Sequence, residues 1–176
     1  MEDFRHYERL AASSTLASFE RETSHLFLCR MSTADLGESD GPLAFKTAGN
    51  SSPGVGSEEQ GMLIRAVRKR EGNPYPERFS VGRATNCDIV LRMAVVSKLH
   101  GHLTQSGGRL LVSDNRSSNG TWVNGVAVTP GDMVPVEIGA ELRFGTVKML
   151  LLSVTDLYRM LRAQSEEESA SKSPDP

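Results

Sequence analysis

The chain has 176 residues, of which 38% are hydrophobic and 24% are charged, a composition that suits one ordinary globular domain with extensions. No window approaches the roughly 20 apolar residues that a membrane-spanning helix needs, and the first residues lack the pattern of a secretory signal. We therefore expect a cytoplasmic protein with no membrane partner. Cys29 and Cys87 are far apart in the sequence, and we expect two reduced thiols.

The net charge of −2 conceals an uneven distribution. Residues 1–60 hold 5 basic and 10 acidic residues, residues 61–165 hold 14 and 8, and residues 166–176 hold 1 and 4. The basic middle favours an anionic ligand, but its excess is too small and too scattered to indicate nucleic acid.

The first sixty residues fall into three parts. Residues 3–23 have a helical pattern that a Ser-Ser-Thr sequence interrupts, which predicts one bent helix or two short ones. The apolar face of this segment packs either on the rest of the chain or on a partner, and the sequence leaves both open. Residues 25–31 are a short apolar run that we predict to be a strand at a sheet edge. Residues 32–60 have the Gly, Ser, Pro and acidic composition of a flexible linker.

From residue 62 the apolar residues alternate with a period of two, which is typical of strands. Nine short runs, separated by Gly, Asn, Asp and Pro, predict an all-β sandwich or barrel. These runs begin at Met62, Arg78, Asp88, His100, Arg109, Thr121, Met133, Glu141 and Val147. The sequences Ser106-Gly-Gly and Pro130-Gly-Asp are the clearest hairpin signals.

A helical pattern begins at Ser153, with Asp156 three residues later in the place of the acid of a capping box. We expect this helix to pack on the sandwich and to end near Gln164. Residues 165–176 are acidic and rich in Ser and Pro, which predicts a disordered tail.

Polar residues in the predicted loops and strands occur in five blocks. They are Gly82-Arg83, Asp88-Ile-Val-Leu91, Ser97-Lys98-Leu-His100, Asp114-x-x-Ser117-Ser118-Asn119-Gly120-Thr121, and Asn124-Gly125. Their order resembles the signature of the forkhead-associated (FHA) domain family over residues 62–153, in the bacterial arrangement of one module with an N-terminal extension. The resemblance implies the binding of phosphothreonine peptides.

The resemblance, together with the patterns of the flanking segments, predicts a fold and a domain arrangement. The fold is an all-β sandwich of two twisted, mainly antiparallel sheets, with an N-terminal helical extension and a C-terminal helix. We predict a helical and edge-strand extension at residues 1–31, a linker at 32–60, the FHA domain with its helix at 61–164, and the tail at 165–176.

By this resemblance, Arg83 and Ser97 contact the phosphate and Lys98 supplies a basic side chain. Ser118 and Asn119 line the other wall, where Asn119 bonds the peptide backbone. A planar guanidinium suits a phosphate dianion because it donates two parallel charge-assisted hydrogen bonds. The residues expected to support this site are Gly82, His100, Gly120, Thr121, Asn124 and Gly125. Gly101 departs from the family pattern, which usually has a small residue with a side chain there.

The sequence supports two other functions, hydrolysis and metal binding, less well. Ser97, His100 and Asp114 are the residue types of a hydrolase triad, but the sequence has no Gly-x-Ser-x-Gly elbow, so we expect no enzyme and no cofactor. His100 and His102 are the residue types of metal ligands, but no third ligand cluster accompanies them, so we expect no metal.

We therefore predict an adaptor in Ser/Thr kinase signalling, whose partner is a phosphothreonine-containing kinase or kinase substrate. The open alternative is a phospho-independent scaffold or oligomerisation module with the same fold. A further hypothesis is an intramolecular contact between the acidic flanks and the basic domain, with Thr33, Thr47 and Thr155 as the threonines to test.

Overall fold

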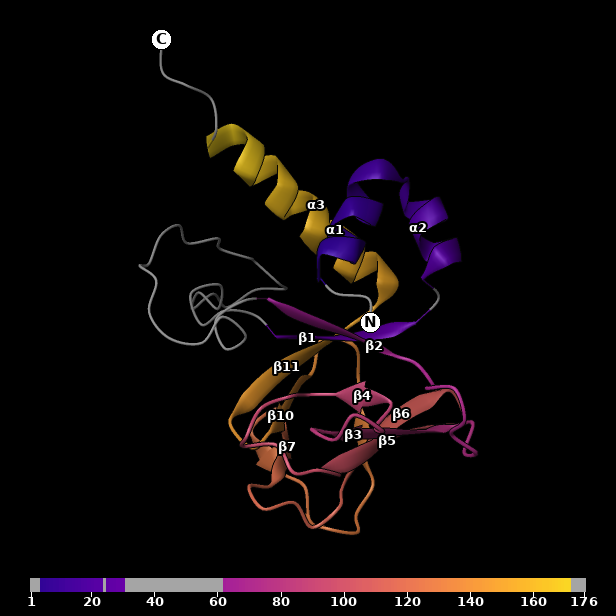
Figure 1. Cartoon of the computed structure of the whole chain (residues 1–176), viewed down its shortest axis with the longest axis vertical. Coiled ribbons are helices and arrows are strands. Elements are labelled where there is room, and N and C mark those ends of the chain that lie inside the picture. Colours follow the sequence, from indigo (N-terminus) through magenta and orange to yellow (C-terminus); the bar gives the residue numbers. More distant parts are fainter. Residues whose placement is uncertain (1–3, 24, 31–61, 172–176) are drawn as a thin grey trace.

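The computed structural model describes residues 4–23, 25–30 and 62–171. These residues form three layers, namely a layer of helices, a six-stranded sheet and a five-stranded sheet (Figure 1). The helices are α1 (Phe4–Ser13), α2 (Leu16–Glu22) and α3 (Val154–Ser171). The strands are β1 (Leu26–Arg30), β2 (Leu63–Val67), β3 (Arg78–Gly82), β4 (Ile89–Val90), β5 (Gly101–Ser106), β6 (Arg109–Asp114), β7 (Thr121–Val123), β8 (Val126–Ala127), β9 (Val134–Val136), β10 (Glu141–Phe144) and β11 (Val147–Leu152).

The two sheets confirm the predicted sandwich. The first has the strand order β2-β1-β11-β10-β7-β8, and the second has the order β4-β3-β5-β6-β9. Neighbouring strands are antiparallel except β3 and β4, which are parallel. Each of the nine predicted runs contains a strand.

Only one of the two predicted hairpins forms. Gly107 and Gly108 have φ values of 56° and 76° and join β5 to β6, as the Ser-Gly-Gly sequence predicts. The turn at residues 130–132 instead follows β8 in the first sheet and leads to β9 in the second. The prediction of a hairpin there is wrong, because a turn sequence specifies a local change of direction and not the pairing of the strands beyond it.

Strand β1 forms as predicted, but it lies inside the sheet rather than at its edge. It pairs with β2 on one side and with β11 on the other. Its side chains are buried on both faces, since Leu28 belongs to the core between the sheets while Phe27 and Cys29 face the helical layer. A continuous apolar run is the pattern of a strand covered on both faces. Truncation of the whole N-terminal extension would therefore remove an interior strand.

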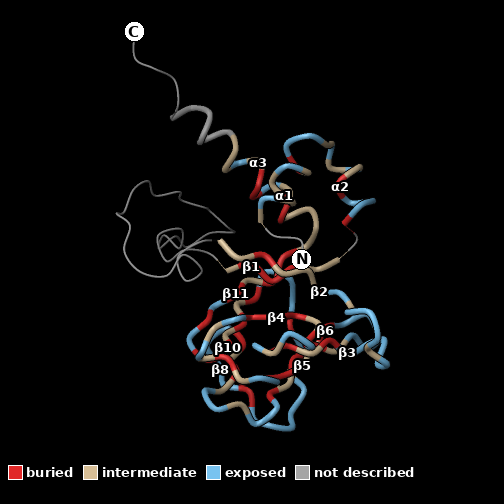
Figure 2. The backbone as a smooth tube through the Cα atoms, viewed as in Figure 1, coloured by how far each residue is buried: buried red, intermediate tan, exposed pale blue. Residues whose placement is uncertain are grey.

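The helical layer covers the outer face of the six-stranded sheet. Tyr7 of α1, Phe19 of α2 and Leu157 of α3 are buried in a second core against β1, β2 and β11. The rings of Tyr7 and Phe27 meet edge to face with centroids 5.1 Å apart. Figure 2 shows buried positions along the strands, with exposed positions gathering in the loops at the end of the sandwich remote from the helices. The N-terminal apolar face thus packs on this chain.

Hydrogen bonds fix where the helices begin. Thr15 separates α1 from α2 and accepts a bond from the backbone N–H of Ser18 at 3.4 Å, so the Ser-Ser-Thr sequence divides the segment into two helices. Ser153 accepts from the backbone N–H of Asp156 at 3.1 Å. In return the Asp156 carboxylate accepts from the Ser153 hydroxyl at 2.6 Å, rather than from its backbone N–H as in a capping box.

The predicted end of the last helix near Gln164 is wrong, because α3 continues to Ser171. Residues 165–171 therefore do not belong to a disordered tail. The Glu-Glu-Glu run that raises the local charge also has good helix propensity, so an acidic composition does not by itself indicate disorder here. The predicted linker at residues 32–60, with Thr33 and Thr47, and the last residues 172–176 lie outside the described residues.

We expect Tyr7→Ala to lower the free energy of unfolding by about 3 kcal/mol, because it removes a buried ring that joins α1 to β1. Urea denaturation followed by circular dichroism measures this. Tyr75 is 62% exposed, so Tyr75→Ala is a matched control and should change the value by less than about 0.5 kcal/mol. Equal values for both variants would show that the helical layer adds nothing to the stability of the sandwich.

Candidate functional site

The candidate site is built from three loops that follow β3, β4 and β6. Backbone hydrogen bonds align the first two, since the N–H of Arg83 donates to the carbonyl of Ser97 at 3.0 Å and that of Ala84 donates to Lys98 at 3.1 Å. Arg83 and Ser97, which are fourteen positions apart in the sequence, therefore lie side by side.

The hydroxyl of Ser97 connects the second loop to the third. It accepts a hydrogen bond from the backbone N–H of Ser118 at 3.1 Å and lies 3.5 Å from the Ser118 hydroxyl. The structure thus brings together the loops of three residues predicted to bind the phosphopeptide, namely Arg83 and Ser97 at the phosphate and Ser118 on the other wall.

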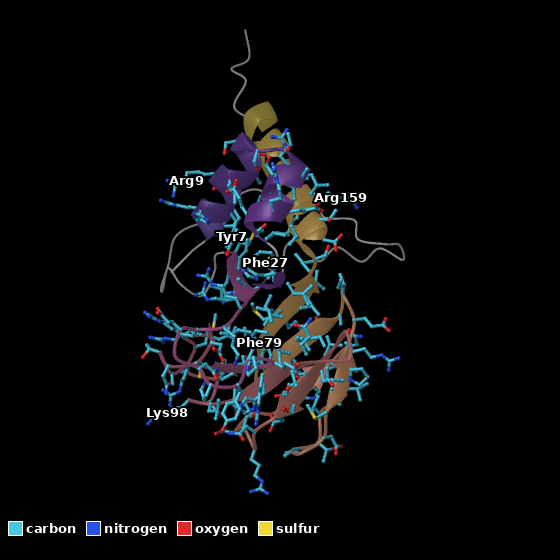
Figure 3. The ribbon with its side chains drawn as sticks, turned by 90° about the vertical axis from the view of Figure 1, so that its right-hand side faces the viewer. Tyr7, Arg9, Phe27, Phe79, Lys98 and Arg159 are labelled. Atoms are coloured by element: carbon cyan, nitrogen blue, oxygen red, sulfur yellow. The ribbon has the colours of Figure 1, made fainter. Side chains whose placement is uncertain are left out.

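The predicted basic side chains of the site are exposed to solvent. Within the described parts of the chain, no hydrogen bond or ion pair engages the guanidinium of Arg83 or the ammonium of Lys98. Figure 3 shows Lys98 pointing into solvent from the sandwich, well away from the helical layer that carries Tyr7 and Arg9. Both cations are therefore available to an anion from solution.

Asn119 has a structural contact that the sequence did not predict. Its side-chain amide donates to the carbonyl of Val95 at 2.8 Å and ties the third loop to the second. The amide oxygen remains available as an acceptor for a ligand. In this loop the backbone is left-handed at Arg116, with φ 52°, and at Gly120, with φ 77°.

His100 is fully buried and connects the second loop to the third. Its Nδ1 accepts from the backbone N–H of Ser97 at 3.1 Å, and its Nε2 donates to the carbonyl of Gly120 at 2.9 Å. These partners require the neutral tautomer protonated on Nε2. Burial lowers the pKa of His100 below its ordinary value of 6.5, which favours that neutral form.

Asp114 is buried and organises the third loop. Its carboxylate accepts from the backbone N–H of Ser117 at 2.9 Å, the Ser117 hydroxyl at 2.6 Å and the Thr121 hydroxyl at 2.6 Å. Burial alone would raise the pKa of Asp114, but these hydrogen bonds hold it below its ordinary value. Thr121, predicted as a supporting residue, thus acts on the loop through Asp114.

Gly82 and Gly101 allow close backbone approaches. A Cβ atom on Gly82 would lie 2.3 Å from the carbonyl oxygen of Lys98, and one on Gly101 would lie 2.4 Å from that of Ser113. The departure from the family pattern at Gly101 therefore has a steric reason in this chain. Gly82 is needed because the first loop lies directly against the second.

Asn124 and Gly125 form the turn between β7 and β8, with φ values of 48° and 80°. The Asn124 side chain accepts from the backbone N–H of Glu141 at 2.9 Å, so this turn is fixed to β10. The hydrogen bonds of Asn124 therefore run to β10 rather than to the loops around Arg83.

Sequence reasoning missed the part that Asp88 plays beside the site. Its carboxylate accepts from the backbone N–H of Arg70 at 2.8 Å and from the N–H and hydroxyl of Ser80, both at 2.7 Å. Burial would raise the pKa of Asp88, but these bonds lower it. The only signal in the sequence is that Asp88 directly precedes an apolar strand. That signal does not identify Ser80 and Arg70 as its partners, because they lie eight and eighteen residues away.

The geometry does not form a hydrolase triad. The two ring nitrogens of His100 are engaged by the backbone of Ser97 and Gly120, and the Ser97 hydroxyl interacts with Ser118. No group of three metal-ligating side chains occurs among the residues that the structure describes. In the same described residues, no helix is both long and apolar enough to cross a membrane.

Part of the chain is similar to known proteins. Residues 79–145 match the family model of the FHA domain. A Mycobacterium tuberculosis ABC transporter ATP-binding/permease protein, Rv1747, is 34% identical over 92 residues, which cover 46% of this chain and 11% of that protein. The FHA domain-containing protein PS1 of Arabidopsis thaliana is 37% identical over 71 residues, which cover 39% of this chain and 5% of that protein. The chain thus spans only a small part of these curated relatives.

Among solved structures, the N-terminal FHA domain of Saccharomyces cerevisiae Rad53p, in complex with a phosphothreonine peptide, is 22% identical with a TM-score of 0.44. The similarity covers 55% of this chain and 89% of that one. The residues that match the family model include the strands and loops that carry Arg83, Ser97, Lys98, Ser118 and Asn119.

We expect the free energy of unfolding to fall as the pH drops from 7 to 5. Burial, followed by the charge of Arg78, lowers the pKa of His102 from 6.5 to about 4, and the pKa of His100 is lowered in the same direction. Below pH 6.5 the unfolded chain binds protons that the folded chain does not, so stability is lost.

His102 should account for about 1 kcal/mol of this loss of unfolding free energy, after allowance for its partial exposure to water. Urea titrations at pH 7 and pH 5 measure it, and His102→Gln should reduce the loss. A loss of the same size in that variant would contradict the assignment to His102.

Proposed function

We propose that the chain is a phosphothreonine-peptide-binding adaptor in Ser/Thr kinase signalling. The observation that carries this proposal is the meeting of three loops, since the backbone of Arg83 is bonded to that of Ser97 and the Ser97 hydroxyl lies beside Ser118. These loops carry one exposed guanidinium and two hydroxyls. A phosphate dianion needs several convergent donors, of which a charged guanidinium is the strongest.

The proposed roles follow from the donor types. Arg83 binds two phosphate oxygens in a bidentate manner, Ser97 donates a third hydrogen bond, and Lys98 contributes a mobile positive charge. Asn119 orients the peptide backbone through its free amide oxygen, while its N–H holds Val95. Ser118 forms the opposite wall beside Ser97.

The supporting residues hold these donor groups in position even when no ligand is bound. His100 holds the backbone of Ser97 and Gly120, and Asp114 holds Ser117 and Thr121. A site that is fixed in advance loses less conformational entropy on binding. We propose that this is why buried polar residues lie beneath exposed loops.

We expect a phosphothreonine peptide to bind in the micromolar range, ~ −8 kcal/mol, and Arg83→Ala to weaken binding by at least about 100-fold, because it removes the bidentate contact. Isothermal titration of the full chain measures both. Arg109→Ala is the matched control, since Arg109 is also exposed but lies at the start of β6, and it should bind normally.

The unphosphorylated peptide separates this proposal from its alternative. Equal affinity for the phosphorylated and unphosphorylated peptides would favour a phospho-independent scaffold. Turnover of ester, phosphate or nucleotide substrates by the purified chain would instead show that the chain is an enzyme.

A further inference from the structure

A groove of about 440 Å³ lies on the outer face of the five-stranded sheet. Its floor includes Ser80 and His102, which are direct cross-strand neighbours on β3 and β5. Lys98 lines it on the side of the phosphate cluster, and Ala84 and Asn86 come from the same loop as Arg83. The groove therefore adjoins the loops of the candidate phosphate site, and Lys98 belongs to both.

The groove is positively charged. Arg78 and Lys98 line it, and none of its lining residues is acidic. The carboxylate of Asp88 lies behind the groove, because its side chain is 1% exposed and is bonded to Ser80, Asn73 and the backbone of Arg70. This carboxylate therefore lies behind Ser80 and Asn73 and is bonded by protein donors rather than exposed to a ligand in the groove.

The cation at the far end is held in position. The Arg78 guanidinium lies 3.0 Å from Nδ1 of His102, and the pKa of His102, lowered to about 4, leaves that nitrogen neutral and able to accept the bond. Tyr75 and Leu99, which are 62% and 41% exposed, add apolar surface to the groove. This combination of fixed cation and apolar wall suits a flexible acidic side chain with an aliphatic stem.

We propose that this groove binds acidic side chains of the same peptide whose phosphothreonine contacts Arg83, and that Arg78 is a determinant of specificity. This inference rests on the proposed function. Arg78 and Arg83 are five residues apart along and just beyond β3, about 16 Å at the rise of a strand. An extended peptide covers that length in about five residues, so the acidic residues lie three to five positions from the phosphothreonine.

Three fluorescein-labelled peptides test this inference by anisotropy with the full chain. Each has a phosphothreonine in an alanine background. One has neutral flanks, one has glutamates three to five positions before the phosphothreonine, and one has them three to five positions after it. We expect one of the acidic peptides to bind about fivefold more tightly than the neutral peptide and the other to show no gain.

Arg78→Gln should abolish that gain and leave the affinity for the neutral peptide unchanged, while Arg109→Gln should leave both unchanged. The gain should also shrink at high salt, because the contact is exposed. Equal affinities for all three peptides, an equal gain for both acidic peptides, or a gain that survives Arg78→Gln would overturn the assignment of the groove. Failure of the neutral phosphothreonine peptide to bind would instead overturn the proposed function itself.

Discussion

The buried imidazole of His100 is the contact on which the candidate site depends. It accepts from the backbone of Ser97 and donates to the carbonyl of Gly120, so one neutral ring fixes the two loops that carry most of the proposed phosphate donors. The imidazole of His100 also packs against the ring of Phe144 in β10, with the two rings nearly perpendicular and their centroids 5.6 Å apart. The position of Ser97 is therefore linked to the hydrophobic core, and the exposed loops gain rigidity from buried strands.

Two buried carboxylates extend this arrangement to either side. Asp114 closes the third loop through Ser117 and Thr121, and Asp88 holds Ser80 of β3 and the segment that begins at Arg70. Both carboxylates are satisfied by several donors, which makes burial of their charge tolerable. The helical layer lies on the other side of the six-stranded sheet, and it leaves the loops around Arg83 open to solvent.

Much of this structure is predictable from the sequence, and the failures have identifiable causes. The period-two runs predict the strands. The order of the polar blocks predicts the residues that the folded chain brings together around Arg83 and Ser97. The interior place of β1 was missed because burial on both faces depends on the helical layer, which a single apolar run does not reveal. The bond from Asn119 to Val95 and the partners of Asp88 join residues far apart in sequence, and local patterns carry no information on such pairs. Helix α3 extends beyond its predicted end because the acidic residues after Gln164 have good helix propensity, although their composition is also typical of disordered tails.

The most direct test of the account is a titration of the ¹⁵N-labelled full chain with a phosphothreonine peptide, followed by amide chemical shifts. The account predicts that the largest changes occur at Arg83, Ser97, Lys98, Ser118 and Asn119, and that the helical layer shows little change. Saturable changes centred on the helices, with the three loops unaffected, would contradict it.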